Sequence, residues 1–556
     1  MATLTQTKED LITSISKFYQ WEKALPNKVY LHQPISGHWH TWTFAESGQE
    51  IRKIAQYLKE SYAPGTKIAV MSRNCAHWLM TDLAITMADC ISVPIYPNVN
   101  RDTVSYVLEH SEAQMLFVGK LLPNDWKEMR NGIPADMPCV SFGMYGLDAD
   151  YKTWDSVCQE TEPLQGEPTP PIKDKLTIIY TSGTTGRPKG VVLTHESLSF
   201  SIAQFHKVFN LVASDRFFSY LPLSHIAERM LISQGSLVGG SDVFFAESLD
   251  TFADNLKHAR PTIFLAVPRI WTKFQMGVLT KFPPSRLKMI LSIPIINGII
   301  KKKIQEALGL DQARVILTGA APMSSSLMNW YDKLNINIHE VYGMTENCAL
   351  SHANRPGEKK AGTVGKVMYG VEMKLTEEGE ICTKSVANLQ EYYKMPEKTA
   401  ETIKDGWLHT GDKGVIDSDG FVRITGRVKD LFKTSKAKYV APNPIEMKLS
   451  KNPIIEQVCV VGNGIPQPLA LVVLSENGRE MGREEAKESL AETLKELNPK
   501  LEHHEQLQKI VVMPEEWTVE NNLLTPTLKI KRNEIDGQFE SNYEKWYEGG
   551  KGVIFA

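Results

Sequence analysis

The sequence predicts an α/β protein in which a large N-terminal domain of helix-covered β-sheets precedes a smaller α+β domain. At 556 residues the chain is too long for one hydrophobic core, because single cores stop growing near about 250–300 residues. Short apolar runs alternate with helix-like segments between residues 43 and 118, and this βαβα order indicates parallel strands covered by helices. Two apolar runs and one long helical pattern follow near the C-terminus, which favours a separate small domain.

Individual elements follow from the spacing of apolar residues. Residues 43–62 carry apolar side chains at helical spacing, and Thr43 with Glu46 has the sequence of a capping box. Strands are then predicted over 67–71, 91–95 and 115–118, and helices over 76–87 and 103–111. Near the C-terminus the predicted elements are strands over 458–461 and 469–474 and a helix over 483–497.

Composition excludes several classes of protein. A formal net charge of -3 gives no sign of nucleic-acid binding. The seven cysteines are scattered and form no C-x-x-C pair, so neither a disulfide framework nor a zinc site is expected. A reducing cytoplasm is the simplest setting, and the first residues lack the apolar core of a signal peptide.

The most membrane-like stretch is Met289–Ile300, which three lysines follow at 301–303. It is shorter than the roughly 20 residues of a spanning helix and contains Pro294 and Gly298. We predict a core segment with a solvated basic end. The alternative is a surface that docks on the inner face of a membrane or on a second subunit; the sequence leaves both this contact and a homodimer open.

A polar loop between the apolar runs 178–180 and 191–193 carries the strongest chemical signal. It consists of Thr181, Ser182, Gly183, Thr184, Thr185, Gly186, Arg187, Pro188, Lys189 and Gly190. Glycines allow close backbone approach, and hydroxyls, backbone N–H groups and one lysine suit a polyphosphate. A flexible Gly/Ser/Thr hairpin is the plain alternative. The Walker pattern is excluded, because no G-K-[ST] follows.

This loop strongly resembles the signature of the adenylate-forming (AMP-binding) superfamily, which includes acyl-CoA synthetases, luciferases and peptide-synthetase adenylation domains. The resemblance implies that the loop binds the β- and γ-phosphates of ATP, with Thr184 and Lys189 as catalytic residues. Residues 74–97 and 106–119 are also typical of acyl-CoA synthetases. An acyl-CoA synthetase/luciferase-like fold is therefore expected.

Two further turns suit the nucleotide. Gly319, Ala320 and Ala321 follow an apolar run and leave room for a flat ring. Tyr342 follows the alternating run 336–341 and offers an aromatic face to a purine. Each turn alone is a weak signal, but their order resembles the family's adenine motif.

The adenine motif continues into a predicted magnesium site. The resemblance implies that Gly343 and Thr345 also lie at the nucleotide. Glu346 offers hard oxygens for Mg²⁺, and the resemblance makes it both a catalytic residue and, with Thr184, a metal ligand.

The resemblance alone assigns two residues to the acyl pocket. His225 lies in 220–230 and Val267 in the strand-like stretch 262–271. A lone histidine is more often structural, and 262–271 on its own reads as a central strand.

A second informative stretch, 406–427, reads as two strands joined by the turn 417–420. Such a hairpin brings Asp412 close to Arg427. A carboxylate can accept two ribose hydroxyls, and arginine can donate to the sugar or to phosphate. A salt bridge between the hairpin ends is equally plausible by geometry. The resemblance assigns both residues to ribose binding.

The resemblance also divides the chain. Lys429 matches the family's hinge, which gives an N-terminal AMP- and acyl-binding domain over 1–426, a hinge over 427–430 and a mobile C-terminal domain over 431–556. A basic loop then follows, whose charges suit the phosphates of CoA. Its candidate CoA-binding residues are Lys433, Ser435, Lys436 and Lys438. Many relatives have glycine where this chain has Ala437, so the loop's backbone path is open.

The last motif, 526–532, resembles the family segment in which one lysine reaches the reacting carboxylate, and that position is Lys529. The expected reaction is ATP- and Mg²⁺-dependent activation of a long-chain fatty acid to acyl-AMP, then transfer to CoA with release of AMP and pyrophosphate. Alternatives are a standalone ligase that loads a carrier protein, a luciferase-like oxygenase and a non-catalytic acyl-nucleotide binder. Acyl chain length is not determined by the sequence.

Overall fold

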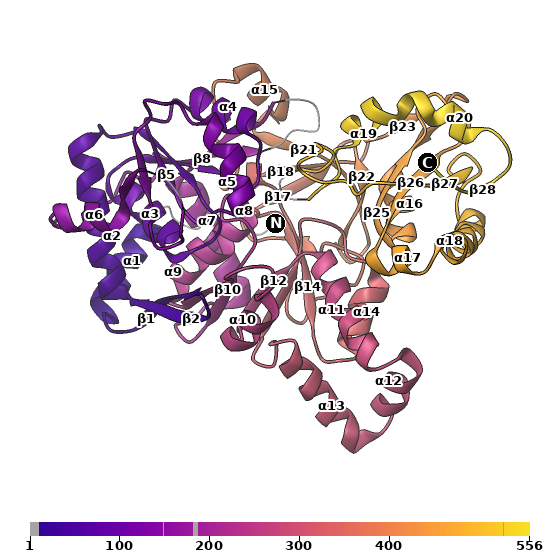
Figure 1. Ribbon diagram of the computed structural model, residues 1–556, viewed down its shortest axis with the longest axis horizontal. Coiled ribbons are helices and arrows are strands. Elements are labelled where there is room, and N and C mark those ends of the chain that lie inside the picture. The colour runs from indigo at the N-terminus through magenta and orange to yellow at the C-terminus, as the bar shows by residue number, and fades with distance from the viewer. Residues whose placement is uncertain (1–10, 148–149, 182–186, 429, 526–527) are drawn as a thin grey trace. The chain divides into compact units, whose positions relative to one another are not determined.

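The computed structural model describes residues 11–147, 150–181, 187–428, 430–525 and 528–556 (Figure 1). The chain forms two compact units, each counted over its described residues. The first comprises Met1–Thr181, Pro188–Glu372 and Thr383–Leu408. The second comprises Ser182–Arg187, Met373–Cys382 and His409–Ala556. The predicted domain limits at 426 and 431 remain a prediction.

The first unit contains a nine-stranded sheet in the order β16-β15-β14-β13-β12-β10-β11-β1-β2. Its six inner strands, from β14 to β1, run parallel, and β2, β15 and β16 pair antiparallel at the edges. The strands are β1 (Val29–Ile35), β2 (His38–Thr43), β10 (Arg216–Ser219), β11 (Asp242–Phe245), β12 (Ile263–Ala266), β13 (Val315–Thr318), β14 (Ile338–Tyr342), β15 (His352–Ala353) and β16 (Lys366–Val367).

A second sheet of the same unit has eight strands in the order β19-β9-β8-β4-β3-β5-β6-β7. The strands are β3 (Lys67–Met71), β4 (Ile91–Ile95), β5 (Met115–Val118), β6 (Cys139–Ser141), β7 (Lys152–Thr153), β8 (Lys175–Thr181), β9 (Lys189–Thr194) and β19 (Glu391–Tyr392). The strands predicted over 67–71, 91–95 and 115–118 are confirmed residue for residue.

Helices flank both sheets. They are α1 (Ser14–Ala24), α2 (Phe44–Ser61), α3 (Ala76–Met87), α4 (Arg101–Ser111), α5 (Pro123–Met129), η2 (Arg130–Gly132), α6 (Trp154–Glu160), α7 (His195–Phe209), α8 (Ile226–Glu228), η3 (Arg229–Gln234), α9 (Gly235–Gly239), α10 (Phe252–Ala259), α11 (Pro268–Lys281), α12 (Pro284–Leu291), α13 (Pro294–Ala307), α14 (Ser325–Asp332), η4 (Thr345–Asn347) and α15 (Pro396–Thr402). The capping box of Thr43 and Glu46 is confirmed at the start of α2.

A five-stranded sheet in the order β17-β18-β21-β20, with β22 on β21, contributes most of its residues to the second unit. The strands are β17 (Glu372–Leu375), β18 (Glu380–Lys384), β20 (Ile403–Lys404), β21 (Trp407–Ile416) and β22 (Val422–Arg427). The predicted hairpin around 417–420 is confirmed as β21 and β22.

The rest of the second unit is a small α+β fold around the sheet β25-β26-β27-β28. Side chains alternate between its faces, so Val458 and Val460 join one apolar cluster and Cys459 and Val461 another. The elements are β23 (Phe432–Lys433), β24 (Tyr439–Val440), α16 (Pro442–Leu449), β25 (Ile455–Val461), β26 (Leu469–Leu474), α17 (Glu476–Glu480), α18 (Arg483–Leu497), η5 (Asn498–Lys500), β27 (Lys509–Val512), α19 (Arg532–Phe539), η6 (Glu540–Asn542), α20 (Tyr543–Tyr547) and β28 (Gly552–Phe555). The large α/β and small α+β parts confirm the predicted fold class.

The prediction of a core segment at Met289–Ile300 is wrong. The segment forms the end of α12 and the first half of α13. Its side chains Met289, Ile293, Ile296 and Ile299 are exposed, because these helices bury only a few apolar positions against the unit. Within the described residues, no helix is both long and apolar enough to cross a membrane.

Candidate active site

The phosphate-loop prediction falls on the hairpin between β8 and β9. Thr181 and Lys189 are register partners at its loop end, and Thr181 Oγ1 donates to the Lys189 carbonyl at 3.5 Å. The predicted strand-loop-strand arrangement is therefore confirmed on both sides of the loop. Ser182, Gly183, Thr184, Thr185 and Gly186 lie outside the described residues.

A chain of side chains leads from this hairpin to the predicted magnesium ligand. The ammonium of Lys189 lies 4.9 Å from the centre of the Tyr392 ring, which is cation–π distance. The Tyr392 hydroxyl donates to Glu346 Oε1 at 2.7 Å. Pairing of β19 with β9 holds Tyr392 opposite Val191, so these contacts join the two sheets of the first unit.

Sequence reasoning missed Tyr392. The dipeptide Tyr392-Tyr393 has no local pattern that indicates a site. Its contact with Glu346 spans 46 residues of sequence and arises from sheet pairing, which a single sequence does not reveal.

The carboxyl ends of the parallel strands gather most of the remaining candidates. Val267 follows β12, Gly319 follows β13, and Tyr342 ends β14. Parallel strands present their carboxyl ends at one edge of a sheet, which is where open α/β sheets bind ligands. His225 comes from the connection after β10, and its Nδ1 accepts from the Ala227 N–H at 3.2 Å.

Backbone geometry explains the small residues at this edge. A Cβ on Gly343 would lie 2.4 Å from the carbonyl carbon of Ala349, and one on Gly319 would lie 3.0 Å from the Val341 oxygen. Ala320 takes the left-handed conformation with φ 64°, a strained state for alanine that clusters at functional sites. The turn after β13 and the turn after β14 are therefore held close together.

Two acids near this edge are buried. Burial raises the pKa of the Glu228 carboxyl to about 8, although hydrogen bonds oppose the shift. Its Oε1 accepts from Ser219 Oγ at 2.9 Å and from the Tyr220 N–H at 2.9 Å. Burial likewise raises the pKa of the Glu340 carboxyl in β14 to about 8. Both groups therefore favour the protonated form in the folded chain.

Glu228→Gln is expected to change the pH dependence of stability. Between the ordinary pKa of 4.5 and the folded value of about 8, only the folded state keeps the proton. Each pH unit of rise in this window shifts the unfolding equilibrium up to about tenfold against the folded state. Glutamine stays neutral, so the variant should gain stability over the wild type as pH rises through this window. Urea midpoints measured across it provide the test.

The control for this prediction is Glu162→Gln, which changes an exposed carboxylate of the same unit. It should show no comparable pH-dependent difference from the wild type. A constant difference between Glu228→Gln and the wild type across the window would contradict a raised pKa at Glu228.

In the second unit, Asp412 and Arg427 are register partners in the β21–β22 hairpin. Arg427 Nε donates to Asp412 Oδ1 at 2.9 Å, so the predicted proximity is confirmed. Ribose binding by this pair stays a prediction, because the same contact is expected of a salt bridge that only joins the ends of the hairpin.

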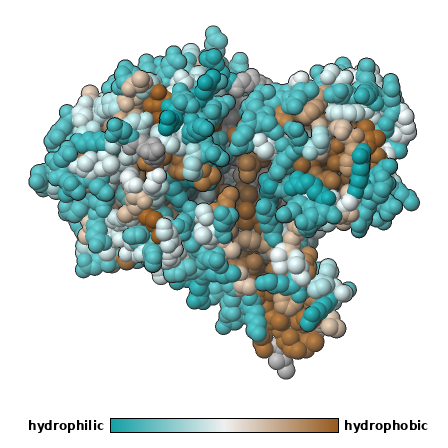
Figure 2. Space-filling view, viewed as in Figure 1, coloured by the Kyte–Doolittle hydropathy of each residue, from teal (hydrophilic) through white to brown (hydrophobic). Residues whose placement is uncertain are grey.

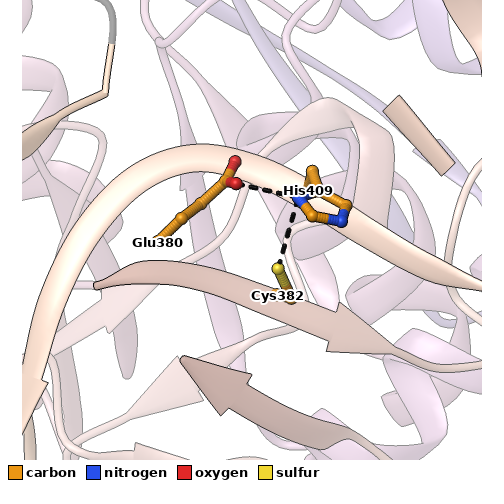
Figure 3. Close-up of side chains that lie close together, drawn as sticks. All are labelled: Glu380, Cys382 and His409. Atoms are coloured by element: carbon orange, nitrogen blue, oxygen red, sulfur yellow. Dashed lines mark hydrogen bonds and ion pairs between the residues drawn. The ribbon is translucent and has the colours of Figure 1, made fainter. Parts of the chain in front are cut away.

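The part of β21 that precedes Asp412 contacts a cluster of Glu380, Cys382 and His409 (Figure 3). His409 Nδ1 lies 2.8 Å from Glu380 Oε2 and 3.5 Å from Cys382 Sγ. The other Glu380 oxygen accepts from the Gly411 N–H at 2.9 Å. Both side chains contact the same histidine nitrogen, so the arrangement is not a nucleophile–base–acid relay, which uses both ring nitrogens. The cluster links β18 to β21 beside Asp412 by hydrogen bonds.

Lys529 lies exposed on a tight turn. The Thr525 N–H donates to the Lys529 carbonyl at 2.7 Å, and the Lys529 N–H donates to Thr525 Oγ1 at 3.0 Å. Three residues on, Arg532 forms an ion pair with Glu446 at 2.8 Å. This pair fixes the base of the turn to α16, a role that sequence reasoning did not assign. Lys429, the predicted hinge, lies outside the described residues.

The candidate CoA residues share one small hairpin formed by β23 and β24. All four candidates are exposed: Lys433, Ser435, Lys436 and Lys438. Ala437 takes the left-handed conformation with φ 58°, so alanine follows the path that glycine takes most easily.

Ala437→Gly is therefore expected to stabilise the second unit by up to about 1 kcal/mol, because relief of left-handed strain exceeds the added entropy of the unfolded chain. The matched control is Ala491→Gly on the exposed face of α18, which should cost about 1 kcal/mol. Urea unfolding of both variants measures the difference. Equal destabilisation would contradict the left-handed backbone at 437.

Comparison with known proteins identifies the family. A family model described as AMP-binding enzyme matches residues 18–393, and one described as AMP-binding enzyme C-terminal domain matches residues 429–551. The first match covers more than half of the chain. The chain therefore belongs to the AMP-binding enzyme family, as its loop predicted.

Individual relatives agree. Long-chain-fatty-acid–CoA ligase 5 of Rattus norvegicus is 30% identical, over 90% of this chain and 84% of its own length. Long-chain-fatty-acid–CoA ligase FadD15 of Mycobacterium bovis is 28% identical, over 95% of this chain and 96% of its own. The A-PCP didomain of carboxylic acid reductase from Segniliparus rugosus, solved with AMP, superposes with a TM-score of 0.82 at 21% identity, over 98% of this chain and 83% of that chain. This last likeness concerns the fold.

Proposed function

We propose that this chain is a long-chain fatty acid–CoA ligase. It converts a fatty acid and ATP to acyl-AMP and pyrophosphate, then transfers the acyl group to CoA and releases AMP. Family membership supports the adenylate chemistry. The observation that carries the substrate class is the similarity, over most of their lengths, to relatives named long-chain-fatty-acid–CoA ligases.

The resemblance to the family assigns each nucleotide-binding residue its role. Tyr342 stacks on adenine, and the turn Gly319–Ala321 leaves space for the ring. Asp412 accepts from the ribose hydroxyls, and Arg427 donates to the sugar or to phosphate. The hairpin loop, with Lys189 at its end, binds the β- and γ-phosphates.

The residues at Glu346 fit a magnesium ion. One carboxylate oxygen accepts from Tyr392, and the other takes no hydrogen bond from any described residue. A largely buried carboxylate with one oxygen to spare is a suitable hard ligand. Magnesium bound there, with Thr184, supplies positive charge at the phosphates.

Lys529 reduces the charge repulsion that opposes the first step. The carboxylate and the α-phosphate are both negative and repel each other. An ammonium placed between them stabilises charge that develops on the phosphoryl oxygens. Attack by the carboxylate forms the acyl–phosphate bond, and the bond to the departing pyrophosphate breaks.

In the second step the CoA thiol attacks acyl-AMP, the thioester bond forms, and AMP leaves. The basic hairpin with Lys433, Lys436 and Lys438 attracts the CoA phosphates, with Ser435 beside them. His225 and Val267 line the acyl site. Withdrawal of Lys529 by rotation about Lys429 makes room for the thiol.

One experiment tests the whole assignment. Purified protein, ATP, Mg²⁺ and CoA are incubated with free acids of increasing chain length, and AMP and acyl-CoA are measured. We expect stoichiometric AMP and acyl-CoA with a maximum at long chains. Release of ADP and orthophosphate, or no ATP consumption with any acid, would overturn the proposal.

The same assay separates the alternatives. Pyrophosphate exchange that depends on fatty acid, but no acyl-CoA, would identify a ligase that loads a carrier protein. Nucleotide binding without exchange would identify a binder. A non-catalytic binder should lack at least one residue that the reaction needs. It is disfavoured, because all five are present: Lys189, Glu346, Asp412, Arg427 and Lys529.

A further inference from the structure

One stretch of the first unit has an unusual charge pattern. Residues 255–305 contain ten lysines and arginines and no aspartate or glutamate. The chain as a whole is nearly balanced, with a formal net charge of -3. The positive charge is therefore concentrated in one continuous stretch, which ends with the lysines at 301–303.

The same stretch exposes apolar side chains. Met289 is 60% exposed, Ile293 41%, Ile296 41% and Ile299 54%. These four are among the fifteen large apolar side chains that are exposed in the described part of the chain, and they fall within eleven residues. Figure 2 shows hydrophobic residues gathered at the end of the molecule that α12 and α13 form in Figure 1.

Helices α12 and α13 each bury one side against the first unit and leave the side with the exposed apolar residues uncovered by any described residue. Leu287 and Ile304 are buried and anchor α12 and α13 in a core cluster of the first unit. Ile296, Ile299 and Lys303 follow each other at helical spacing and are exposed, so they share another side of α13. We call the exposed residues Arg286, Lys288, Met289, Ile293, Ile296, Ile299, Lys302 and Lys303 the α12–α13 tip.

The basic residues of the tip are available for a ligand. Among the described residues, Arg286, Lys288, Lys302 and Lys303 take part in no ion pair. Lys301 is different, because its Nζ donates to Asn335 Oδ1 at 3.2 Å. Long basic side chains beside an apolar patch can lay their stems along it and keep their charge outward.

We propose that the α12–α13 tip docks the protein on a bilayer that contains anionic phospholipids. The four apolar side chains enter the boundary between head groups and acyl chains, and the arginine and lysines contact the head-group phosphates. A second copy of the chain is a poorer occupant, because two identical basic tips would repel each other.

Helix α11 connects the α12–α13 tip to the proposed acyl site, so docking would bring that site near fatty acids in the bilayer. Helix α11 starts at Pro268, directly after Val267, and only residues 282 and 283 separate it from α12. The tip is thus joined through one helix to the proposed acyl wall, and a fatty acid is an amphiphile that partitions into bilayers. The docking itself depends on the surface and not on the proposed reaction.

Vesicle flotation of the full chain tests the proposal. Vesicles of phosphatidylcholine alone are compared with equimolar phosphatidylcholine and phosphatidylglycerol. The wild type should float with the anionic vesicles at low salt and much less with the neutral ones. Lys302→Gln/Lys303→Gln should weaken binding by about 25-fold, since each basic residue near an anionic surface contributes roughly fivefold. Ile296→Gln/Ile299→Gln should also lose binding.

Matched controls separate the site from general charge and hydropathy. Lys487→Gln/Lys495→Gln removes two exposed lysines of α18, and Leu122→Gln/Leu249→Gln removes two exposed leucines elsewhere in the first unit. Both controls should float like the wild type. Release of AMP with a soluble fatty acid should be unchanged in all four variants, so failure of docking and failure of the proposed reaction are distinguishable.

Three results would overturn the proposal. They are no flotation of the wild type with anionic vesicles, unchanged flotation of both tip variants, and dissociation of a wild-type dimer by Ile296→Gln/Ile299→Gln in sedimentation without vesicles. The last result would assign the face to a second copy.

Discussion

Lys529→Ala should lower the rate of acyl-AMP formation by about 10²–10³-fold, the usual loss when one preorganised donor to a developing charge is removed. The substitution keeps both hydrogen bonds that the backbone of Lys529 makes with Thr525, one to its N–H and one to its hydroxyl, so it removes the ammonium and not the turn. Preformed acyl-AMP should still react with CoA at close to the wild-type rate, because its phosphoryl bond is already made. Fatty-acid-dependent ATP–pyrophosphate exchange and thioester formation from synthetic acyl-AMP measure the two steps separately.

Lys531→Ala is the control for this prediction. Lys531 carries the same charge two residues away and donates to Asn522 Oδ1 at 2.5 Å, so its loss tests for a general effect on the segment. Both half-reactions should stay near the wild-type rate in this variant. Equal loss of both half-reactions in Lys529→Ala would contradict the role assigned to Lys529.

Glu346→Gln should lower adenylate formation by about 10²-fold or more, because a neutral amide replaces the carboxylate that suits a hard cation. Glutamine keeps an oxygen that can accept from the Tyr392 hydroxyl, so the hydrogen bond that links the two sheets is retained. The Mg²⁺ concentration needed for half-maximal pyrophosphate exchange should rise. Exchange measured over a range of Mg²⁺ concentrations gives both quantities.

Tyr392→Phe separates the position of the carboxylate from its charge. It removes the 2.7 Å hydrogen bond to Glu346 and keeps the aromatic ring beneath Lys189. A hydrogen bond to a charged group contributes roughly 1.5–3 kcal/mol, so we expect a roughly 10- to 150-fold loss of exchange, partly recovered by added Mg²⁺. Unchanged exchange in Glu346→Gln would remove the metal assignment, and a loss in Tyr392→Phe that no Mg²⁺ reverses would show that the tyrosine does not position Glu346.

Local sequence patterns predicted many elements with their bounds. The strand 67–71, the helix 76–87 and the helix 483–497 match the structure residue for residue. These segments combine a clear apolar period with distinct boundaries, and Thr43 caps α2 through contacts only three residues away. Interactions within one turn of chain are encoded in the residues themselves.

Long-range contacts could not be predicted in the same way. Tyr392 reaches Glu346 only because β19 pairs with β9 across the sheet. Arg532 reaches Glu446 from 86 residues away. The segment 289–300 was predicted as core from its hydropathy, yet only the packing of α12 and α13 decides which of its faces is covered. Such choices depend on neighbours that adjacent residues do not specify.

The sequence by itself determined the family, the order of the nucleotide-binding segments and the concentration of positive charge in 255–305, since each is carried by residue identity. The tertiary structure decided which distant residues contact each other within each unit. It joined Lys189, Tyr392 and Glu346, and it left the apolar α12–α13 tip uncovered. The physical reason is that covalent neighbours fix local conformation, whereas burial and exposure are settled by packing between distant parts of the chain.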